Sequence, residues 1–367
     1  MQYRKFGNTG RETSALGFGM MRLPRLEDGR IDEQWSIRVL RKAIDDGLSY
    51  VDTAYAYPDS ERVTGLALAD GYREKVMLAT KLPVNKVETE EDFDKILNEE
   101  LSRLQTDHVD NYMLHALNLD RWENKVKPLH LVDHMIRAKA DGRVRHIGFS
   151  FHDNLELFKT IIDSYDGWDF CQIQLNYLDT NYQAGLEGLA YARERGLAVI
   201  IMEPLRGGKL ANVPQQVAQC LPKSPVESAL DFLWDLEGVS VLLSGMNTEE
   251  QVHQNMSYAD KAQVGMLSKQ ERETIARAAE EMRKVVSIPC TGCGYCKVCP
   301  QQIDIPTVFA IYNQYQLDGH GREAREKYSA LTPNGSDCVS CGTCVQQCPQ
   351  NINIPEELAK VHKVFGT

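Results

Sequence analysis

Eight short runs of β-branched and apolar residues alternate with longer amphipathic stretches through most of the chain. The runs predict strands over residues 14–19, 49–52, 76–81, 109–114, 144–149, 170–174, 198–202 and 239–244. Helical patterns follow the strands over residues 33–46, 61–69, 91–104, 131–140, 155–164, 186–195 and 226–236, and from residue 249 onward. Strands and helices that alternate in this way form parallel sheets, and eight such units favour a closed (β/α)8 TIM barrel.

A change in the pattern marks the end of this alternation. One further amphipathic helix, over residues 269–285, leads toward Pro289. The chain has 367 residues, which leaves room for a barrel of roughly 250 residues and a smaller appended domain. We therefore expect a barrel over residues 1–285 and a second domain over residues 286–367.

Eight of the ten cysteines fall into two similar runs near the end of the chain. The first run contains Cys290, Cys293, Cys296 and Cys299 followed by Pro300, and the second contains Cys338, Cys341, Cys344 and Cys348 followed by Pro349. The residues after each run repeat as CPQQIDIP and CPQNINIP, so a module has been duplicated or one binding site is built from two halves. Cys171 and Cys220 stand alone, and we expect them to be small buried side chains.

The cysteine spacing predicts iron-sulfur chemistry. Three cysteines at two-residue intervals with a remote fourth followed by proline are typical of 4Fe-4S clusters, and the fourth cysteine of each run ligates the other cluster. One cluster is then expected on Cys290, Cys293, Cys296 and Cys348, and the other on Cys338, Cys341, Cys344 and Cys299. Two zinc sites, each with four thiolate ligands, remain an alternative.

The same region, over residues 288–355, resembles the two-cluster bacterial ferredoxins. It departs from them in two ways: the interval from Cys296 to Cys299 is one residue shorter, and a long helix-prone insert separates the runs. The insert favours a small, mostly helical ferredoxin-like domain. In a reducing compartment, closely spaced cysteines are more often metal ligands than disulfides.

Four polar residues fall at or just after the ends of predicted strands. Asp52 ends the second strand and Tyr57 follows it, while Lys81 ends the third and His115 the fourth. Each residue alone has an ordinary explanation, such as a helix cap or a solvated side chain. Functional residues of a barrel cluster at the carboxyl ends of its strands, so their shared position on one rim indicates a site.

These residues carry a resemblance to the aldo-keto reductase family. The sequence DTAYAY followed by Ser-Glu, with Lys81 in LATKL and His115 in NYMLH, resembles that family over roughly residues 1–285. The resemblance implies a catalytic tetrad in which Tyr57 donates a proton, His115 orients a carbonyl group and Asp52 holds Lys81. An ammonium group beside a phenol lowers its pKa from the usual value near 10, which makes Tyr57 a better proton donor. An aldehyde or ketone would be reduced to an alcohol.

The resemblance also implies a nicotinamide dinucleotide as hydride source. No GxGxxG motif follows a strand, but this absence argues only against a Rossmann-type site. Barrels bind phosphate with the loops after strands seven and eight, which read EPLRGGKL and SGMNTEEQVHQN here. The resemblance assigns cofactor contacts to Ser150, Gln172, Met202, Pro204, Leu205, Gly207, Gly245, Met246, Gln251, Gln254 and Asn255. Ordinary turn glycines and helix caps are the alternative interpretation of these loops.

Departures from the family pattern affect the choice of cofactor. Phe151 replaces an asparagine, and Met202 replaces a tyrosine that often stacks on the nicotinamide. Gly245 and Gln251 stand where a lysine and an arginine commonly bind the 2′-phosphate of NADPH. The loss of two cations weakens the case for NADPH over NADH, although Arg206 or Lys209 can compensate. The cofactor is NADPH or NADH, with NADPH slightly favoured.

Three hypotheses follow from joining these two chemistries. Nicotinamides transfer electron pairs as hydride, whereas each cluster transfers one electron. A flavin usually links two-electron and one-electron transfer. No dedicated flavin motif is present in the sequence, but a bound flavin is still an alternative. In the first hypothesis, a carbonyl reductase exchanges electrons through its clusters. In the second, the clusters of the reductase are structural or sense redox state. In the third, an electron-transfer or scaffold protein uses a barrel that has lost hydride activity.

The composition limits the partners. The formal net charge of −11 and the lack of a basic stripe argue against binding to nucleic acid or an acidic membrane surface. No signal peptide and no run of 18 uncharged apolar residues is present, so we expect a cytoplasmic protein. The expected partners are a small carbonyl substrate and a redox partner protein at the ferredoxin-like domain. In the loop over residues 116–128, Trp122 is expected either to close over a substrate or to pack against the next helix.

Overall fold

The structure is a computed structural model that describes residues 1–285 and 287–366. Residue 286, where the predicted second domain begins, lies outside the described residues. The chain divides into two compact units, one formed by residues 1–204 and 229–268 and the other by residues 205–228 together with those from 269 onward. The second unit therefore includes a segment from the middle of the sequence.

The first unit contains a closed barrel of eight parallel strands, as the alternation predicts. The strands are β3 (Leu16–Gly19), β4 (Tyr50–Asp52), β5 (Met77–Leu82), β6 (Val109–Leu117), β7 (Val144–Phe151), β8 (Phe170–Gln174), β9 (Ala198–Met202) and β10 (Val239–Ser244). They follow one another around the barrel in chain order, and β10 pairs with β3 to close it. This order brings the ends of β4, β5 and β6 side by side.

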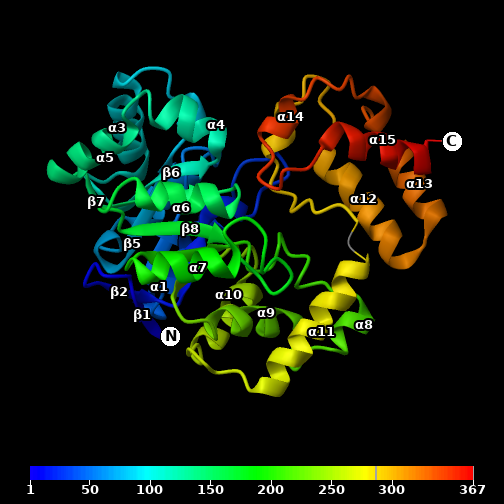
Figure 1. The fold of residues 1–367 in the computed structure, drawn as a ribbon, viewed down its shortest axis with the longest axis horizontal. Helices are drawn as coiled ribbons and strands as arrows, with labels where there is room; N and C mark the ends of the chain where they lie inside the picture. The colour runs from blue at the N-terminus through cyan, green and yellow to red at the C-terminus, as the bar shows by residue number, and fades with distance from the viewer. Residues whose placement is uncertain (286, 367) are drawn as a thin grey trace. The chain divides into compact units, whose positions relative to one another are not determined.

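A helix follows each strand of the barrel (Figure 1). These helices are α1 (Glu33–Asp45), α2 (Ser60–Leu68), α3 (Glu91–Leu104), α5 (Leu131–Ala140), α6 (Leu155–Asp163), α7 (Gly185–Glu194), α9 (Pro225–Trp234) and α10 (Glu249–Ala259). Side-chain caps fix several of their starts: the Asp32 carboxylate accepts a hydrogen bond from Trp35 N at 3.0 Å, and the Asn154 side chain accepts one from Leu157 N at 3.0 Å.

The amino-terminal end of the barrel is filled by apolar side chains. A short hairpin of β1 (Tyr3–Lys5) and β2 (Glu12–Ser14) precedes the barrel and carries Phe6. The Phe6 ring lies 5.8 Å from the ring of Phe170 and 6.1 Å from that of Tyr50, both at the first positions of their strands. This packing leaves the carboxyl ends of the strands as the end where polar groups gather.

The second unit is mostly helical, as expected for a ferredoxin-like domain with a long insert. It contains α8 (Gln215–Ala218), α11 (Lys269–Val285), η5 (Tyr295–Val298), α12 (Ile305–Asp318), α13 (Gly321–Ser329), η6 (Gly335–Asp337), α14 (Thr343–Gln346) and α15 (Ile354–Phe365). Aromatic residues of α12, α13 and α15 form its core, where the Phe365 ring lies 6.0 Å from Tyr312 and 5.7 Å from Tyr328. Cys296 and Cys344 belong to the same core.

The repeated sequences CPQQIDIP and CPQNINIP adopt repeated structures. Each one leads into a helix, α12 in the first case and α15 in the second, with proline in the first turn. The isoleucines of both copies are buried. The duplication therefore extends from the sequence to the local fold.

The two cysteines outside the runs differ in burial. Cys171 is buried in β8, as expected, whereas Cys220 is only partly buried, so that expectation was wrong for Cys220.

Among the helices of the described residues, none is both long and apolar enough to cross a membrane.

Candidate active site and cysteine groups

A buried ion pair joins the ends of β4 and β5. Asp52 pairs with Ala79 across the two strands, and Lys81 lies two residues further along β5 on the same face. The Lys81 Nζ atom lies 2.6 Å from Asp52 Oδ1 and donates a second hydrogen bond of 2.7 Å to the carbonyl oxygen of Thr53. Both side chains are almost completely buried. Burial lowers the pKa of Lys81 and raises that of Asp52, and each partner opposes the shift of the other.

Tyr57 and His115 lie beside this ion pair. Tyr57 belongs to the loop between β4 and α2, and the Lys81 Nζ atom is 5.0 Å from the centroid of its ring. The His115 ring, on β6, lies 6.0 Å from the Tyr57 ring at an interplanar angle of 86°. The structure thus brings the four predicted catalytic residues together from three neighbouring strand ends.

The electrostatic surroundings keep His115 neutral. Burial lowers the pKa of His115 well below its usual value, and the nearby charge of Lys81, then Arg121, adds to this effect. A neutral imidazole carries one N–H donor and one acceptor nitrogen. His115 can therefore donate one hydrogen bond to an oxygen atom without competing with Lys81 for charge.

Two charged or titratable residues near this site were missed in the sequence. Arg121 lies in α4 (Leu119–Arg121), and its Nη1 atom donates a 2.5 Å hydrogen bond to the carbonyl oxygen of Ala116. His152 follows β7, and burial followed by the charge of Arg121 lowers its pKa to about 4. Both residues come just after strand ends, which was the only signal that could have found them. The next residue, Trp122, begins η4 (Trp122–Val126) and is buried.

Gln172 has the clearest feature of a cofactor contact. It lies in the middle of β8, and the Nε2 atom of its buried side chain donates to the sulfur of Met202 at 3.6 Å. Its Oε1 atom is buried without a hydrogen-bond partner within the described residues 1–285 and 287–366. A buried carbonyl acceptor normally has a partner, so a bound carboxamide N–H would satisfy it. Ser150 Oγ accepts a hydrogen bond of 2.7 Å from Ala116 N and keeps its own proton for donation.

The loop after β10 is ordered by residues that were expected to bind the cofactor. The Gln251 side chain accepts a hydrogen bond from Asn247 N at 2.9 Å, and Asn255 Nδ2 donates to Ser244 Oγ at 3.1 Å. Met246 is buried, and Gln254 Nε2 donates to Glu250 Oε1 at 2.9 Å. The side chains of Gln251 and Asn255 hold the loop, while its backbone N–H groups at the start of α10 are suited to a phosphate.

A cation that the sequence analysis missed lies beside Gly245. A Cβ atom on Gly245 would stand 3.2 Å from the Cβ of Arg22, which belongs to η1 (Met20–Arg22) after β3. The guanidinium of Arg22 lies 3.9 Å from the Glu203 carboxylate. Arg22 thus places a positive charge in the neighbourhood where the expected lysine is replaced by Gly245.

The loop after β9 is divided between the two units. Met202 and Pro204 belong to the first unit, whereas Leu205 and Gly207, with Arg206 and Lys209, belong to the second. Gly207 has a φ of 66°, and a Cβ at this position would lie 2.1 Å from the carbonyl oxygen of Thr291. The structure therefore places Leu205 and Gly207 with the cysteine region.

The eight cysteines form two groups that cross between the runs. Burial, and after it the nearby Cys293, Cys290 and Cys348, raise the pKa of Cys296 to about 12. Burial also raises the pKa of Cys344, with additional contributions from Cys299, Cys338 and Cys341. These neighbours are the same sets of four that the spacing predicts.

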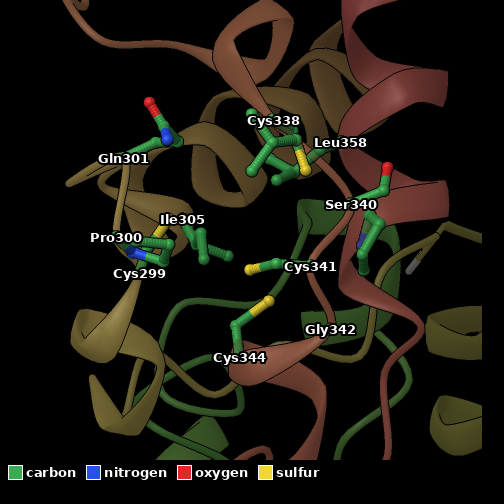
Figure 2. A pocket seen from close by; sticks show the side chains of 12 residues that line it. Cys299, Pro300, Gln301, Ile305, Cys338, Ser340, Cys341, Gly342, Cys344 and Leu358 are labelled. Carbon is green, nitrogen blue, oxygen red and sulfur yellow. The ribbon is translucent and has the colours of Figure 1, made fainter.

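Figure 2 shows the second group from close by. Cys299, Cys338, Cys341 and Cys344 line one pocket together with Ile305 and Leu358, and the sulfurs of Cys341 and Cys344 are directed into the same space. No three His, Cys, Asp or Glu side chains in the described part of the chain form a ready-made site for a single metal ion. Four thiols that line one apolar pocket are a suitable donor set for an iron-sulfur cluster.

Comparisons with known proteins agree with both parts of the chain. The model of the Aldo/keto reductase family matches residues 15–280, and the model of the 4Fe-4S dicluster domain matches residues 289–352. "Aldo-keto reductase YhdN" of Bacillus subtilis (strain 168) is 32% identical over 161 residues, which are 41% of this chain and 47% of that protein. The chain thus spans about half the length of this curated relative.

Other relatives cover more of the chain at lower identity. "L-galactose dehydrogenase" of Arabidopsis thaliana is 26% identical over 287 residues, 70% of this chain and 88% of that protein. Among solved structures, the aldo-keto reductase AKR11C1 from Bacillus halodurans in its holo form has a TM-score of 0.65 at 24% identity. That comparison covers 76% of this chain and 96% of the other and supports the fold.

The lowered pKa of His152 predicts a loss of stability in acid. The folded-state pKa is about 4, below the ordinary value of 6.5, so the unfolded chain binds this proton more readily as the pH falls. The free energy of unfolding should decrease as the pH falls from 6.5 toward 4, and the loss from His152 alone should be about 1–2 kcal/mol near pH 5. Urea unfolding followed by tryptophan fluorescence at pH 7 and pH 5 measures the change. His152→Gln should reduce the difference and the exposed control His253→Gln should not; equal pH dependence in both variants would contradict the assignment.

Proposed function

The chain belongs to the aldo/keto reductase family and carries a 4Fe-4S dicluster domain; from this premise we propose that it is an NAD(P)H-dependent oxidoreductase. It reduces the carbonyl group of an aldehyde or ketone to an alcohol, and two iron-sulfur clusters transfer electrons. The observation that carries the proposal is the buried Lys81–Asp52 pair at 2.6 Å, with Tyr57 and His115 beside it. We place the functional division of the chain at residue 285, between the barrel and the ferredoxin-like domain.

In this proposal Tyr57 is the proton donor. Donation of the phenolic proton to the carbonyl oxygen leaves a phenolate, and the ammonium of Lys81, 5.0 Å from the ring centroid, stabilises that charge. The Asp52 carboxylate holds Lys81 in place and offsets the cost of burying the ammonium. His115, which is neutral, donates its single N–H to the carbonyl oxygen and orients the substrate.

The barrel residues fit a nicotinamide cofactor. The unpartnered Oε1 atom of Gln172 and the Ser150 hydroxyl would hold the carboxamide, and the loop after β10 would hold phosphate. When bound, the reduced nicotinamide supplies the hydride. The slight preference for NADPH is supported by the position of Arg22 beside Gly245.

The two cysteine groups would hold the clusters, one on Cys290, Cys293, Cys296 and Cys348 and the other on Cys299, Cys338, Cys341 and Cys344. When bound, each cluster takes up or releases one electron. The exposed thiol of Cys341 supports a redox partner protein at this domain. Thiolate ligands favour a reducing compartment such as the cytoplasm, which we propose as the location.

Substitution of the proton donor tests the reductase activity. Tyr57→Phe should lower carbonyl reduction by roughly 10²–10⁴-fold, because a general acid contributes that much. The measurement is steady-state reduction of a general aldehyde by NADPH or NADH. Tyr55→Phe is a matched control, since this neighbouring hydroxyl bonds to Glu99 instead. Near-normal turnover in Tyr57→Phe, or no turnover in the unaltered protein, would refute the proposed reaction.

Metal analysis tests the cysteine groups. Anaerobically purified protein should show the broad visible absorption of 4Fe-4S clusters and about eight iron and eight sulfide per chain. A colourless protein that contains zinc would contradict this expectation. Carbonyl reduction measured before and after cluster removal then separates the hypotheses. Equal activity without clusters would favour a structural or redox-sensing role, and no activity in either state would favour a scaffold.

Cofactor titration tests the choice between NADPH and NADH. We expect a lower dissociation constant for NADPH, and Arg22→Gln should raise that constant by roughly tenfold, because a hydrogen bond to a charged group is lost. The dissociation constant for NADH should change much less, since NADH lacks the 2′-phosphate. Protein fluorescence measures both constants. Equal effects on the two cofactors would mean that Arg22 does not contact the 2′-phosphate.

A further inference from the structure

The two cysteine runs share the same backbone path. Gly292 and Ser340, each between the first and second cysteines of their run, both have positive φ angles, 69° and 55°. Gly294 and Gly342, each after the second cysteine, do so as well and start the short helices η5 and α14. Corresponding positions in the two runs can therefore be compared residue by residue.

The comparison shows one clear difference. Thr291 and Val339 both follow the first cysteine of their run. Thr291 is 4% exposed, whereas Val339 is 61% exposed although its side chain is apolar. Since the two runs share their backbone path, this difference in exposure comes from neighbouring parts of the chain, which bury Thr291 in the first run and leave Val339 exposed in the second.

The loop that follows β9 lies against the backbone of Thr291. A Cβ on Gly207 would lie 2.1 Å from the carbonyl oxygen of Thr291 and 2.9 Å from its carbonyl carbon, closer than nonbonded atoms approach. Glycine therefore allows the backbone of residue 207 to lie directly against the first cysteine run. Gly208, the next residue, has nothing within 4 Å of its own Cβ position.

The covering loop is constrained by its own backbone. Arg206, Gly207 and Gly208 have consecutive positive φ angles of 50°, 66° and 90°. Gly208 N and Leu210 N both donate to the carbonyl oxygen of Leu205 at 3.0 Å. Arg206 and Leu210 are buried. These hydrogen bonds and buried side chains together fix the conformation of the loop.

We propose that the first cysteine run and the loop over residues 205–210 form one coupled element, in which the cluster on Cys290, Cys293, Cys296 and Cys348 holds the loop in its cofactor-binding conformation. Loss of that cluster weakens nicotinamide binding, and by thermodynamic reciprocity the bound cofactor stabilises the cluster. The second cluster lacks this effect, because Val339, the position in its run that corresponds to Thr291, is 61% exposed. The cofactor half of this inference rests on the proposed function.

The loop side of the contact is tested with two glycines. Gly207→Ala and Gly208→Ala both place a side chain at a positive φ, but only the former meets the Thr291 carbonyl. Full-length protein purified anaerobically is analysed for iron, sulfide and visible absorption, with circular dichroism as a check on folding. We expect Gly207→Ala to lose about half of its iron, the share of one cluster of two, and Gly208→Ala to keep nearly all. Equal iron contents would overturn the contact as a coupling element.

The cluster side is tested with the corresponding cysteines of the two runs. Cys293→Ala and Cys341→Ala remove equivalent ligands from different groups. We expect Cys293→Ala to raise the dissociation constant of NADPH or NADH at least fivefold, within the usual range of coupling, and Cys341→Ala to change it less than twofold. Equal constants in the two variants would overturn the proposal.

A third measurement uses the unaltered protein in case a variant does not fold. Iron loss to a chelator is followed with and without NADPH, then with NADH, and the bound cofactor should slow the release of about half of the iron. Unchanged release despite measured cofactor binding would overturn the coupling. If the holoprotein binds neither cofactor, the proposed function fails, while the two glycine variants still decide whether the loop supports the cluster.

Discussion

The buried contact between Lys81 and Asp52 is the interaction on which the candidate active site depends. A buried ion pair contributes little net stability, whereas removal of one partner costs about 3–5 kcal/mol because the other charge stays buried. The pair is therefore better explained by its neighbour Tyr57 than by stability. The barrel brings these two side chains together because β4 and β5 are adjacent strands. Asp52 pairs with Ala79, which lies two residues before Lys81 on β5. A neutral His115 completes it without adding a competing cation.

The second unit holds the eight cysteine thiols of both runs in a small domain. Its two halves repeat a backbone path, and each half leads into a helix that contributes to one apolar core. Cys296 and Cys344, the third cysteines of each run, are packed in that core. Because each group takes three cysteines from one run and one from the other, both halves must fold before either group is complete.

The sequence predicted features that follow local rules or fixed spacing. Hydrophobic alternation gave the eight strands, strand ends gave four residues that lie close together, and the cysteine intervals gave the two sets of neighbouring cysteines, while their catalytic and ligand roles stay predictions. The predicted strands over residues 109–114 and 144–149 end before β6 and β7 do, which extend to Leu117 and Phe151. The reason is that the pairing register shifts between Leu114 and Leu117, where a bulge breaks the alternation. Arg22, Arg121 and His152 were missed because they lie in the connections that follow strands, on short helical turns or in a loop, and the paths of these connections depend on tertiary contacts. The sequence also could not predict that residues 205–228 belong to the second unit, because this grouping depends on tertiary contacts such as that between Gly207 and Thr291.

The position of Gly207 also bears on how hydride and single-electron chemistry coexist in one chain. Direct exchange between a nicotinamide and a cluster requires an electron pair to be divided, and no flavin motif supplies that step. A cluster that acts through the loop over residues 205–210 needs no such exchange, because its presence changes a conformation. The covered first run suits this role, and the open second run, with Val339 exposed, suits contact with a redox partner. In our proposal, the asymmetry between two otherwise similar halves lets one cluster support cofactor binding while the other serves electron transfer.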